Sequence, residues 1–314
     1  MDGSQMYRPR RVTLRDVAAA SGVSRATVSF VLRDTPDQAI SVGTRERVRQ
    51  AARDLGYVPH GIARALREGS SRIVVLGIDS GLDTNYTRSY VRGLDAELAA
   101  RDHVLLVRHG PASPQATQQV LDAIAPRAVL QFAQAYLTPG HEFDDGGWDG
   151  GLAGNTAVQL GYLATRGHRH VALALPDGDP PLGQVRLRFA REAARRHGMA
   201  PLTSFAMPRT RAEGAIAVRA FLAAEPQVTA VAGFDDDTTL RILTALRDLD
   251  RAVPADLAVI GFDDGEYGAL ATPALTTVHI DAEDHGRQAA RVILGLEPAR
   301  RIAAPAEVIE RDSV

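Results

Sequence analysis

Residues 12–32, VTLRDVAAASGVSRATVSFVL, contain two short amphipathic helical segments separated by a glycine. Thr13 is a typical helix N-cap, and Asp16 stands where an acidic side chain completes a shortened capping box. Gly22 suits the left-handed conformation that ends a helix, and Ser24 is placed to cap the next one. The segment therefore predicts a helix-turn-helix unit, whose second helix can enter the major groove of DNA.

A third helix is predicted over Thr44–Gly56, so the N-terminal residues form a small all-α domain. Hydroxyl side chains recur at helix starts and on exposed faces of this domain, at Ser24, Thr27, Ser29, Ser41 and Thr44. Hydroxyl groups and helix N-termini are common ligands of DNA phosphates, which favours a nucleic-acid-binding domain. The alternative is a three-helix bundle that has no role on DNA.

Charge is unevenly distributed along the chain. Residues 1–70 contain 12 Arg and 7 acidic residues, a net charge of +5, whereas residues 71–314 contain 24 Arg and 31 acidic residues, a net charge of −7. A basic end on an acidic body indicates contact with nucleic acid through one end of the molecule. A solvated basic surface would give the same balance, so the helix pattern carries more weight.

Composition excludes several other classes of protein. The 314 residues suit about two domains, and the hydrophobic fraction of 45% is that of a folded chain. There is no Cys, which excludes disulfides, thiolate metal sites and Cys nucleophiles, and all 36 basic residues are Arg. Without Lys, a Walker A loop and a Schiff-base enzyme are excluded. No apolar run reaches membrane-spanning length, and no secretory signal is present, so we expect a cytoplasmic protein without a membrane partner.

From Arg72 onward, short apolar runs alternate with amphipathic helical segments. Strands are expected at Ile73–Ile78, Val104–Val107, Ala128–Phe132, Val171–Leu175, Val228–Phe234, Leu257–Phe262 and Leu275–His279. Helices are expected at Arg88–Arg101, Gln115–Ala125, Thr156–Arg166, Gln184–His197, Ala212–Ala224, Asp237–Asp250 and Glu283–Leu294. This alternation predicts parallel α/β sheets, in which ligands bind at the carboxyl ends of strands. Two such sheets in one chain would place a cleft between them.

The motif at 12–32, followed by ISVGTRERVRQAARDLGYVPHGIARAL, resembles the headpiece of the lactose-repressor (LacI) family of bacterial transcription regulators. The resemblance implies that Arg25, Ala26 and Phe30 read base edges and that Arg25 can pair with a guanine. Phe30 stands where Arg is typical of the family, so at the bases facing this residue the operator should differ from the family's common operator sequence. The residues expected to contact DNA are Thr13, Ser24, Arg25, Ala26, Thr27, Ser29, Phe30, Arg33, Ser41 and Thr44 in the headpiece and His60, Ala63 and Leu66 after it.

Residues 59–71 resemble the hinge of that family, after a helix-turn-helix domain at 1–58. The resemblance implies that this segment folds on DNA and that Leu66 wedges into the central minor groove. His60 replaces the usual Asn, and Gly61 lowers helix propensity, so the hinge should depend more on DNA for its order. A passive linker is the alternative interpretation.

The body, residues 72–314, resembles the periplasmic-binding-protein-like sensor of the same family, which serves effector binding and dimerisation. Its landmarks are GHRHVALALP, VTAVAGFDDDTTL, RAVPADLAVIGFDDGEYGALATPALTTV and EVIERDS. The resemblance implies two doubly wound subdomains, the first at 72–150 and 281–302 and the second at 151–280 and 303–314. It also implies an effector site at Tyr86, Asn85, Arg186, Asp235, Asp236 and Asp263, with Tyr86 and Asn85 in a loop after the first strand. An Arg with carboxylates and a ring face suits a sugar-like ligand, although these carboxylates can also serve as helix caps.

The family pattern fails between residues 133 and 154, where the chain is Gly-rich and has no apolar strand run. This departure is consistent with a narrowed pocket, an altered ligand or a sensor that no longer senses. Trp148, the only Trp, can stack on a sugar or cover an exposed sheet edge.

The two rival functions are a hydrolase and a free solute-binding protein. No G-x-S-x-G or H-E-x-x-H motif is present, and the helix-turn-helix segment argues against a free binding protein. We therefore expect a non-enzymatic, homodimeric repressor of a near-palindromic operator, controlled by a small sugar-like effector, with no cofactor and no metal. A degenerate pocket that answers to a protein partner or to no ligand is the alternative. The sequence does not identify the operator, the target genes or the effector. It leaves open whether the effector is an inducer or a corepressor and whether the protein is a repressor or an activator.

Overall fold

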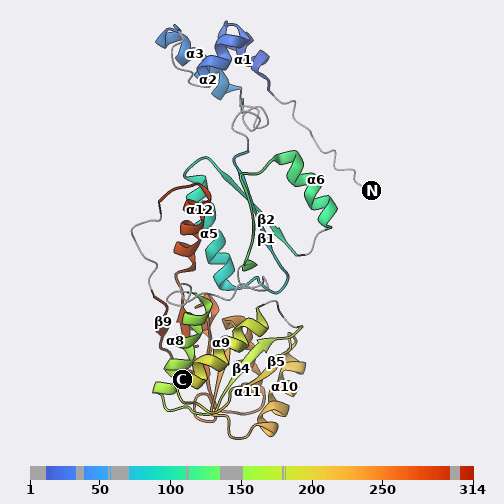
Figure 1. The fold of residues 1–314 in the computed structure, drawn as a ribbon, viewed down its shortest axis with the longest axis vertical. Coiled ribbons are helices and arrows are strands. Elements are labelled where there is room, and N and C mark those ends of the chain that lie inside the picture. Colours follow the sequence, from blue (N-terminus) through green and yellow to red (C-terminus); the bar gives the residue numbers. More distant parts are fainter. Residues whose placement is uncertain are drawn as a thin grey trace. The chain divides into compact units, whose positions relative to one another are not determined.

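The computed structural model describes residues 12–32, 39–55, 57, 71–110, 113–134, 151–178, 180, 182–297 and 305–314. The chain separates into two compact units, Met1–Ser71 and Arg72–Val314 (Figure 1). Each unit folds around hydrophobic clusters of its own. No helix of the described residues is long and apolar enough to cross a membrane.

The first unit contains α1 (Leu14–Ser21), α2 (Arg25–Leu32) and α3 (Val42–Asp54), which pack on one another. Its core contains Val17, Val28, Val31 and Val48, all at most 1% exposed, together with Ala18 and Ala52. The capping box at Thr13 and the left-handed Gly22 (φ 67°) delimit α1 as the sequence predicts. The helix-turn-helix prediction is therefore confirmed, and α3 begins two residues earlier than predicted because Ser41 caps it.

The second unit has two parts, which we call subdomain one (described residues 72–134 and 281–297) and subdomain two (described residues 151–280 and 305–314). Subdomain one has a parallel sheet in the order β2-β1-β3. Its strands are β1 (Ile73–Ile78), β2 (Val104–His109) and β3 (Ala128–Gln131), and its helices are α5 (Asn85–Ala99), α6 (Pro114–Ile124) and α12 (Ala282–Ile293). α5 and α12 lie side by side against one face of this sheet (Figure 1).

Glycines allow the backbones of α5 and α12 to touch. A Cβ atom at Gly93 on α5 would overlap the backbone carbonyl of Glu283, and one at Gly286 on α12 would overlap the carbonyl of Tyr90. This contact joins segments separated by almost 200 residues, because α12 returns from subdomain two to complete subdomain one.

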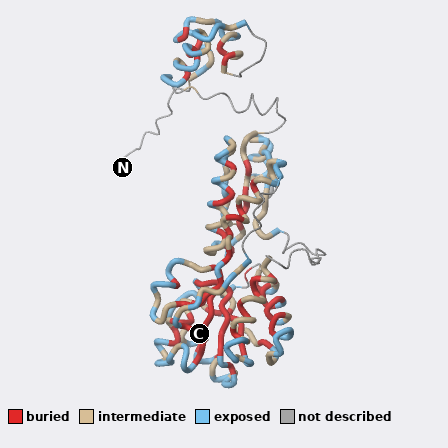
Figure 2. Tube along the Cα trace, turned by 90° about the vertical axis from the view of Figure 1, so that its left-hand side faces the viewer, coloured by how far each residue is buried: buried red, intermediate tan, exposed pale blue. Residues whose placement is uncertain are grey.

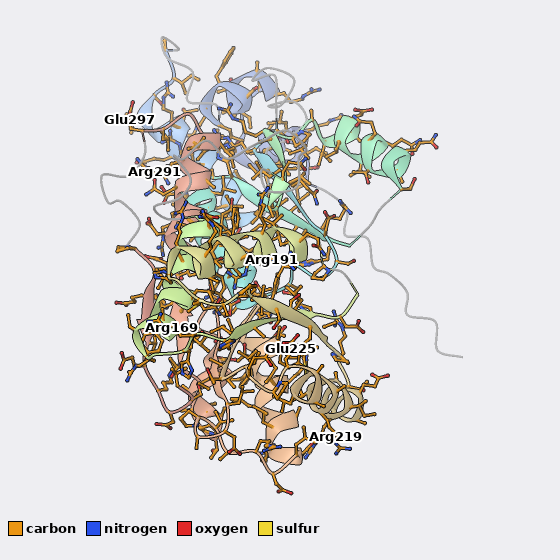
Figure 3. The ribbon with its side chains drawn as sticks, turned by 60° about the horizontal axis from the view of Figure 1, so that its bottom comes forward. Arg169, Arg191, Arg219, Glu225, Arg291 and Glu297 are labelled. Atoms are coloured by element: carbon orange, nitrogen blue, oxygen red, sulfur yellow. The ribbon has the colours of Figure 1, made fainter. Side chains whose placement is uncertain are left out.

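Subdomain two has a parallel sheet in the order β5-β4-β6-β7. Its strands are β4 (Val171–Pro176), β5 (Thr203–Met207), β6 (Ala230–Gly233) and β7 (Ala258–Ile260), and its helices are α8 (Leu152–Thr165), α9 (Gly183–Arg196), α10 (Arg211–Ala224) and α11 (Asp236–Asp248). Alternate residues of the strands pack on α8 and α9 at one face and on α10 and α11 at the other. Figure 2 shows this buried interior in red, and charged side chains such as Arg169, Arg191 and Arg219 project outward in Figure 3.

Three remaining elements close subdomain two: a short 3-10 helix, η2 (Glu266–Leu270), and the antiparallel pair β8 (Thr277–His279) and β9 (Glu307–Ile309). The α/β prediction with two parallel sheets is confirmed. Each predicted strand and helix of the body is present, β1 with the predicted ends and the others with shifted ends. β5 was missed because TSFAM is a partly exposed edge strand without an apolar run.

Two predicted helix starts in the body are wrong. α5 begins at Asn85, because the Thr84 hydroxyl accepts a hydrogen bond from the backbone N–H of Thr87 and caps the helix. Asn85 and Tyr86 therefore form its first turn rather than a loop. α8 begins at Leu152, four residues before the predicted start.

Candidate functional site

The outer face of α2 carries the residues assigned to base contacts. Val28 and Val31 are buried in the headpiece core, and the opposite side of the helix exposes Arg25 and Ala26. Phe30 is half-buried and is not among the described side chains that pack against that core. An apolar ring on a recognition-helix surface is available to contact a thymine methyl group.

The three helices begin with the capping pairs Thr13–Asp16, Ser24–Thr27 and Ser41–Thr44, in which every member except Asp16 is a hydroxyl residue assigned to DNA contact. The first hydroxyl of each pair accepts a hydrogen bond from the backbone N–H of the second residue, at 3.4, 3.1 and 3.3 Å. Capping occupies an acceptor position of each hydroxyl oxygen, but the Thr13 hydroxyl also donates its proton to Asp16 Oδ2 at 2.8 Å. The pairs Ser24–Thr27 and Ser41–Thr44 each keep one hydroxyl proton that can be donated to a phosphate. Ser29 is half-buried on α2. Five residues with predicted roles lie outside the described residues, so those roles stay predictions: Arg33, His60, Ala63, Leu66 and Trp148.

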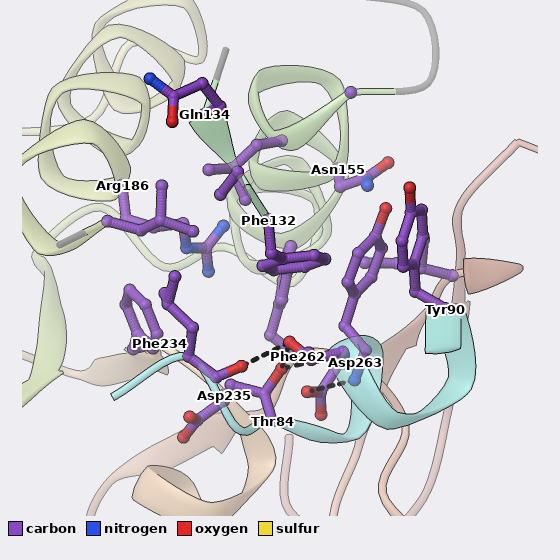
Figure 4. Close-up of a pocket in the computed structure, with 18 of the residues that line it drawn as sticks. Thr84, Tyr90, Phe132, Gln134, Asn155, Arg186, Phe234, Asp235, Phe262 and Asp263 are labelled. Atoms are coloured by element: carbon purple, nitrogen blue, oxygen red, sulfur yellow. Dashed lines mark hydrogen bonds between the residues drawn. The ribbon is translucent and has the colours of Figure 1, made fainter. Parts of the chain in front are cut away.

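A cavity of about 420 Å³ is lined by residues of both subdomains, from the ends of β1, β3, β6 and β7 and from α5, α8 and α9. Four of the six predicted effector residues line it: Tyr86, Arg186, Asp235 and Asp263. Figure 4 shows Arg186, Asp235 and Asp263 among aromatic side chains at this cavity. The position agrees with the rule that ligands bind beyond the carboxyl ends of parallel strands.

Arg186 is 1% exposed and is held by a buried polar network. Its guanidinium donates to the Thr156 hydroxyl, to Gln159 Oε1 at 3.0 Å and to the carbonyl of Gly233 at 3.4 Å. Its Cζ also lies 3.7 Å from the ring centroid of Phe262. Burial lowers the pKa of Arg186 to about 9, and the carboxylates of Asp235 and Asp263 oppose that shift. Arg186 is therefore a fixed positive charge at neutral pH.

The carboxylates of Asp235 and Asp263 have different hydrogen-bond partners. Asp235 caps α11, because its Oδ1 accepts from the backbone N–H of Thr238 at 2.7 Å, so the capping alternative applies to this residue. Asp263 Oδ2 accepts from the backbone N–H of Tyr86 at 3.1 Å, and its Oδ1 has no partner among the described residues. Burial raises the pKa of both carboxyls, and for Asp263 the charges of Asp236 and Asp235 add to the rise.

Asn85 and Asp236 do not line the cavity. Asp236 is 2% exposed and accepts hydrogen bonds from the backbone N–H of Phe262 at 2.8 Å, from that of Gly265 at 2.7 Å and from the Thr277 hydroxyl at 2.6 Å. It supports the loop that carries Asp263. The Asn85 side chain instead donates to backbone carbonyls of that loop.

Sequence reasoning missed the aromatic wall of the cavity. Tyr90, Phe132, Phe234 and Phe262 line it together with Tyr86. The rings of Tyr90 and Phe132 meet edge to face with centroids 5.4 Å apart. The sequence contained a signal for this wall, because a Phe comes one or two residues after the end of three strands of the parallel sheets. These residues are Phe132 after β3, Phe234 after β6 and Phe262 after β7. Aromatic rings beside a few charged groups are typical of sites for ring-shaped polar ligands.

The buried carboxyl group of Asp236 should make the stability of the folded protein depend on pH. Burial raises its pKa to about 7 in the folded protein, from an ordinary value of 3.8, although its three hydrogen bonds oppose the rise. The folded state therefore holds a proton that the unfolded chain releases between about pH 4 and pH 7, and stability falls as pH rises through that window. Asp236→Asn should remove up to about 1.4 kcal/mol per pH unit of this slope.

Denaturant unfolding of the full chain at several pH values between 4.5 and 7.5 measures this slope. Asp237→Asn is the matched control, because Asp237 is the exposed neighbour on the same turn of α11. If both variants keep the slope of the unmodified chain, Asp236 is ionised throughout the window.

Comparison with known proteins matches two parts of the chain. Residues 13–60 match the family of bacterial regulatory proteins, lacI family, and residues 160–314 match the periplasmic binding protein-like domain. The structure superposes on a Lac repressor dimer bound to operator and an anti-inducer with a TM-score of 0.76 and 21% identity, over 97% of this chain and 99% of that one. It superposes on the CelR–cellobiose complex with a TM-score of 0.60 and 25% identity, over 97% and 100% of the two chains.

Relatives along almost the whole chain are regulators. The HTH-type transcriptional regulator CelR of Thermobifida fusca is 30% identical, over 92% of this chain and 93% of its own. The ribose operon repressor and the transcriptional repressor CytR of Escherichia coli K12 are each 27% identical, with at least 90% of every chain covered.

A helix-turn-helix headpiece and a two-part α/β body, together with relatives that are regulators along almost the whole chain, define a DNA-binding transcription regulator rather than an enzyme. The chain belongs to the LacI family of bacterial regulatory proteins.

Proposed function

We propose that this protein is a cytoplasmic, homodimeric repressor that binds a near-palindromic operator through α2 and changes its operator affinity when a sugar-like effector occupies the cavity. The observation that carries the proposal is the buried set of Arg186, Asp235 and Asp263 beside an aromatic wall, between two subdomains of a chain that begins with a helix-turn-helix domain. Carboxylates accept from sugar hydroxyls, Arg donates to them, and rings pack against sugar faces.

The relatives support the same class of ligand. The CelR structure contains cellobiose, and a second relative is named for the ribose operon. A cavity of about 420 Å³ lies within the range of small-molecule sites, which favours a working sensor over a degenerate one.

Selection of bound sequences from random duplex DNA, at a stated salt concentration and followed by footprinting, tests the DNA half of the proposal. A two-fold symmetric motif is expected, because two headpieces of a dimer read two half-sites. Failure to enrich a motif at any salt concentration, with or without the sugars tested next, would contradict it.

The ligand half is tested with the purified full chain on that motif. Cellobiose and ribose are titrated while operator binding is followed by fluorescence anisotropy, and thermal unfolding is recorded in parallel. At least one sugar of this class should raise the unfolding temperature, because a ligand that binds only the folded protein stabilises it. The same sugar should change operator affinity, because effector and operator alter each other's affinity by the same factor. Operator binding that is insensitive to every sugar in an extended panel would favour a protein partner.

Arg25→Ala should relax the preference for one base pair in each half-site. Arg25 is exposed at the first turn of α2, where a bidentate contact to guanine contributes about 1–3 kcal/mol of discrimination. Repeating the selection with the variant measures this preference. Arg53→Ala, which removes an exposed Arg near the end of α3, is the control for charge alone. A uniform loss of affinity across all sequences would make Arg25 a phosphate contact instead.

A further inference from the structure

A hydrogen-bonded contact joins the two subdomains at the edge of the cavity. The Asn85 side-chain amide, on the first turn of α5 in subdomain one, donates to the backbone carbonyls of Asp263 at 2.7 Å and Asp264 at 3.2 Å in subdomain two. The backbone N–H of Tyr86 donates to Asp263 Oδ2 at 3.1 Å. We call these residues, Asn85, Tyr86, Asp263 and Asp264, the α5 latch.

The start of α5 is chemically suited to hold Asp263. The first backbone N–H groups of a helix have no partner within the helix. That of Thr87 is satisfied by Thr84, whereas that of Tyr86 is satisfied by the Asp263 carboxylate from the other subdomain. The helix dipole strengthens this contact, because an anion is favoured at a helix N-terminus.

The loop that meets α5 is held in an uncommon backbone conformation. Asp263 and Asp264 have φ values of 89° and 47°, in the left-handed region that non-glycine residues rarely adopt. Subdomain two maintains this conformation through the Asp236 hydrogen bonds to the loop and through Arg311, which donates to Asp264 Oδ1 at 2.9 Å. The two carbonyls therefore meet the Asn85 amide in a preset geometry.

The same Asp263 side chain faces both the latch and the cavity. One carboxylate oxygen is engaged by subdomain one, and the other has no partner among the described residues, while the residue itself lines the cavity. A ligand that donates to Asp263 therefore binds a group that already joins the two subdomains.

We propose that Asn85 is a positioning residue of the effector response: its amide holds the Asp263 loop against α5, so that cavity occupancy and the relative position of the two subdomains are coupled. The latch itself rests on the hydrogen bonds in the structure alone. Its coupling to a ligand rests on the proposed function. Asn85 does not line the cavity, so its effect on a ligand there passes through Asp263.

The latch can be tested without any ligand. The chain contains no Cys, so Asp95→Cys on α5 and Arg219→Cys on α10 place one spin label on each subdomain at exposed positions (Figure 3 shows Arg219). In the full chain, Asn85→Ala should broaden the distance distribution between the labels or shift it to longer values. Ser89→Ala is the matched control, because Ser89 lies one turn further along and pairs with Arg92 of the same helix. A distribution unchanged by Asn85→Ala overturns the latch.

Ligand binding tests the coupling. Calorimetry with cellobiose and with ribose on the full chain should show about tenfold weaker binding to Asn85→Ala than to the unmodified chain, for whichever sugar binds. Asn85→Asp should weaken binding further, because a carboxylate cannot donate to the two carbonyls and repels Asp263. Unaltered affinity in Asn85→Ala, with altered label distances, overturns the coupling. If neither sugar binds the unmodified chain, the titration is repeated with the sugar from the extended panel that changes operator binding. If no sugar acts, the ligand assignment fails, while the label distances still decide the latch.

Discussion

Gly93→Ala should unfold subdomain one at a temperature about 4–8 °C below that of the unmodified chain. The added methyl group would occupy the position of the Glu283 backbone carbonyl on α12, and a backbone group cannot rotate away as a side chain can. The two helices must separate, and overpacking of this kind costs about 3 kcal/mol or more, which outweighs the gain of about 1 kcal/mol in helix propensity. The net loss of about 2 kcal/mol lowers the unfolding temperature by about 4–8 °C, because a unit of this size loses about 2–4 °C per kcal/mol.

Scanning calorimetry of the full chain measures this shift, and Gly161→Ala is the matched control. Gly161 also lies inside a helix, but the neighbour of its added methyl group is the ring of His197, an exposed side chain that can move. Its unfolding temperature should stay within a few degrees of the unmodified value. Equal, small shifts for both variants would mean that α5 and α12 are not in backbone contact.

Arg186→Ala should abolish the response to effector and lower stability by about 3–5 kcal/mol. The substitution leaves Thr156 and Gln159 without their buried donor and leaves Asp235 and Asp263 without the positive charge between them. Removing one member of a buried, hydrogen-bonded charge set leaves uncompensated charges, which is why the cost exceeds that of a surface ion pair.

Arg186→Lys separates folding from sensing. Lys keeps the positive charge but lacks the planar fork that reaches Thr156 and Gln159 together, so the variant should fold and still lose most of the response. Arg188→Ala is the control, because Arg188 is exposed on the same helix. The readout is the change in operator anisotropy and in unfolding temperature on adding the sugar that acts on the unmodified chain. A normal response from Arg186→Lys would remove Arg186 from the effector site.

The fold was largely predictable because its elements depend on short-range signals. The capping pair Thr13–Asp16, the left-handed Gly22 and the apolar faces of the first two helices lie within a few residues of one another. The strands of the body were recognised where they are central and continuously apolar, as in β1 and β4. The edge strand β5 escaped because its burial is one-sided and its sequence carries Thr and Ser.

The lining of the cavity was predictable only in part, because the direction of side chains at strand ends depends on distant segments. Arg186 and Asp263 were assigned by resemblance to a family, and both line the cavity. Asp236 was assigned to the ligand for the same reason, yet it turns toward the loop at 262–265, since Phe262, Gly265 and Thr277 supply donors there.

The amino-acid sequence by itself therefore determined the headpiece, the order of the strands and helices except β5, and the edge of the sheets at which the cavity lies, since caps, periodicity and the parallel-strand rule act locally or through chain order. The tertiary structure alone decided which carboxylates face the cavity, which rings wall it, and that Asn85 holds the Asp263 loop. Those contacts join residues up to 179 positions apart, through a loop whose backbone adopts left-handed angles that no local signal in the sequence predicted.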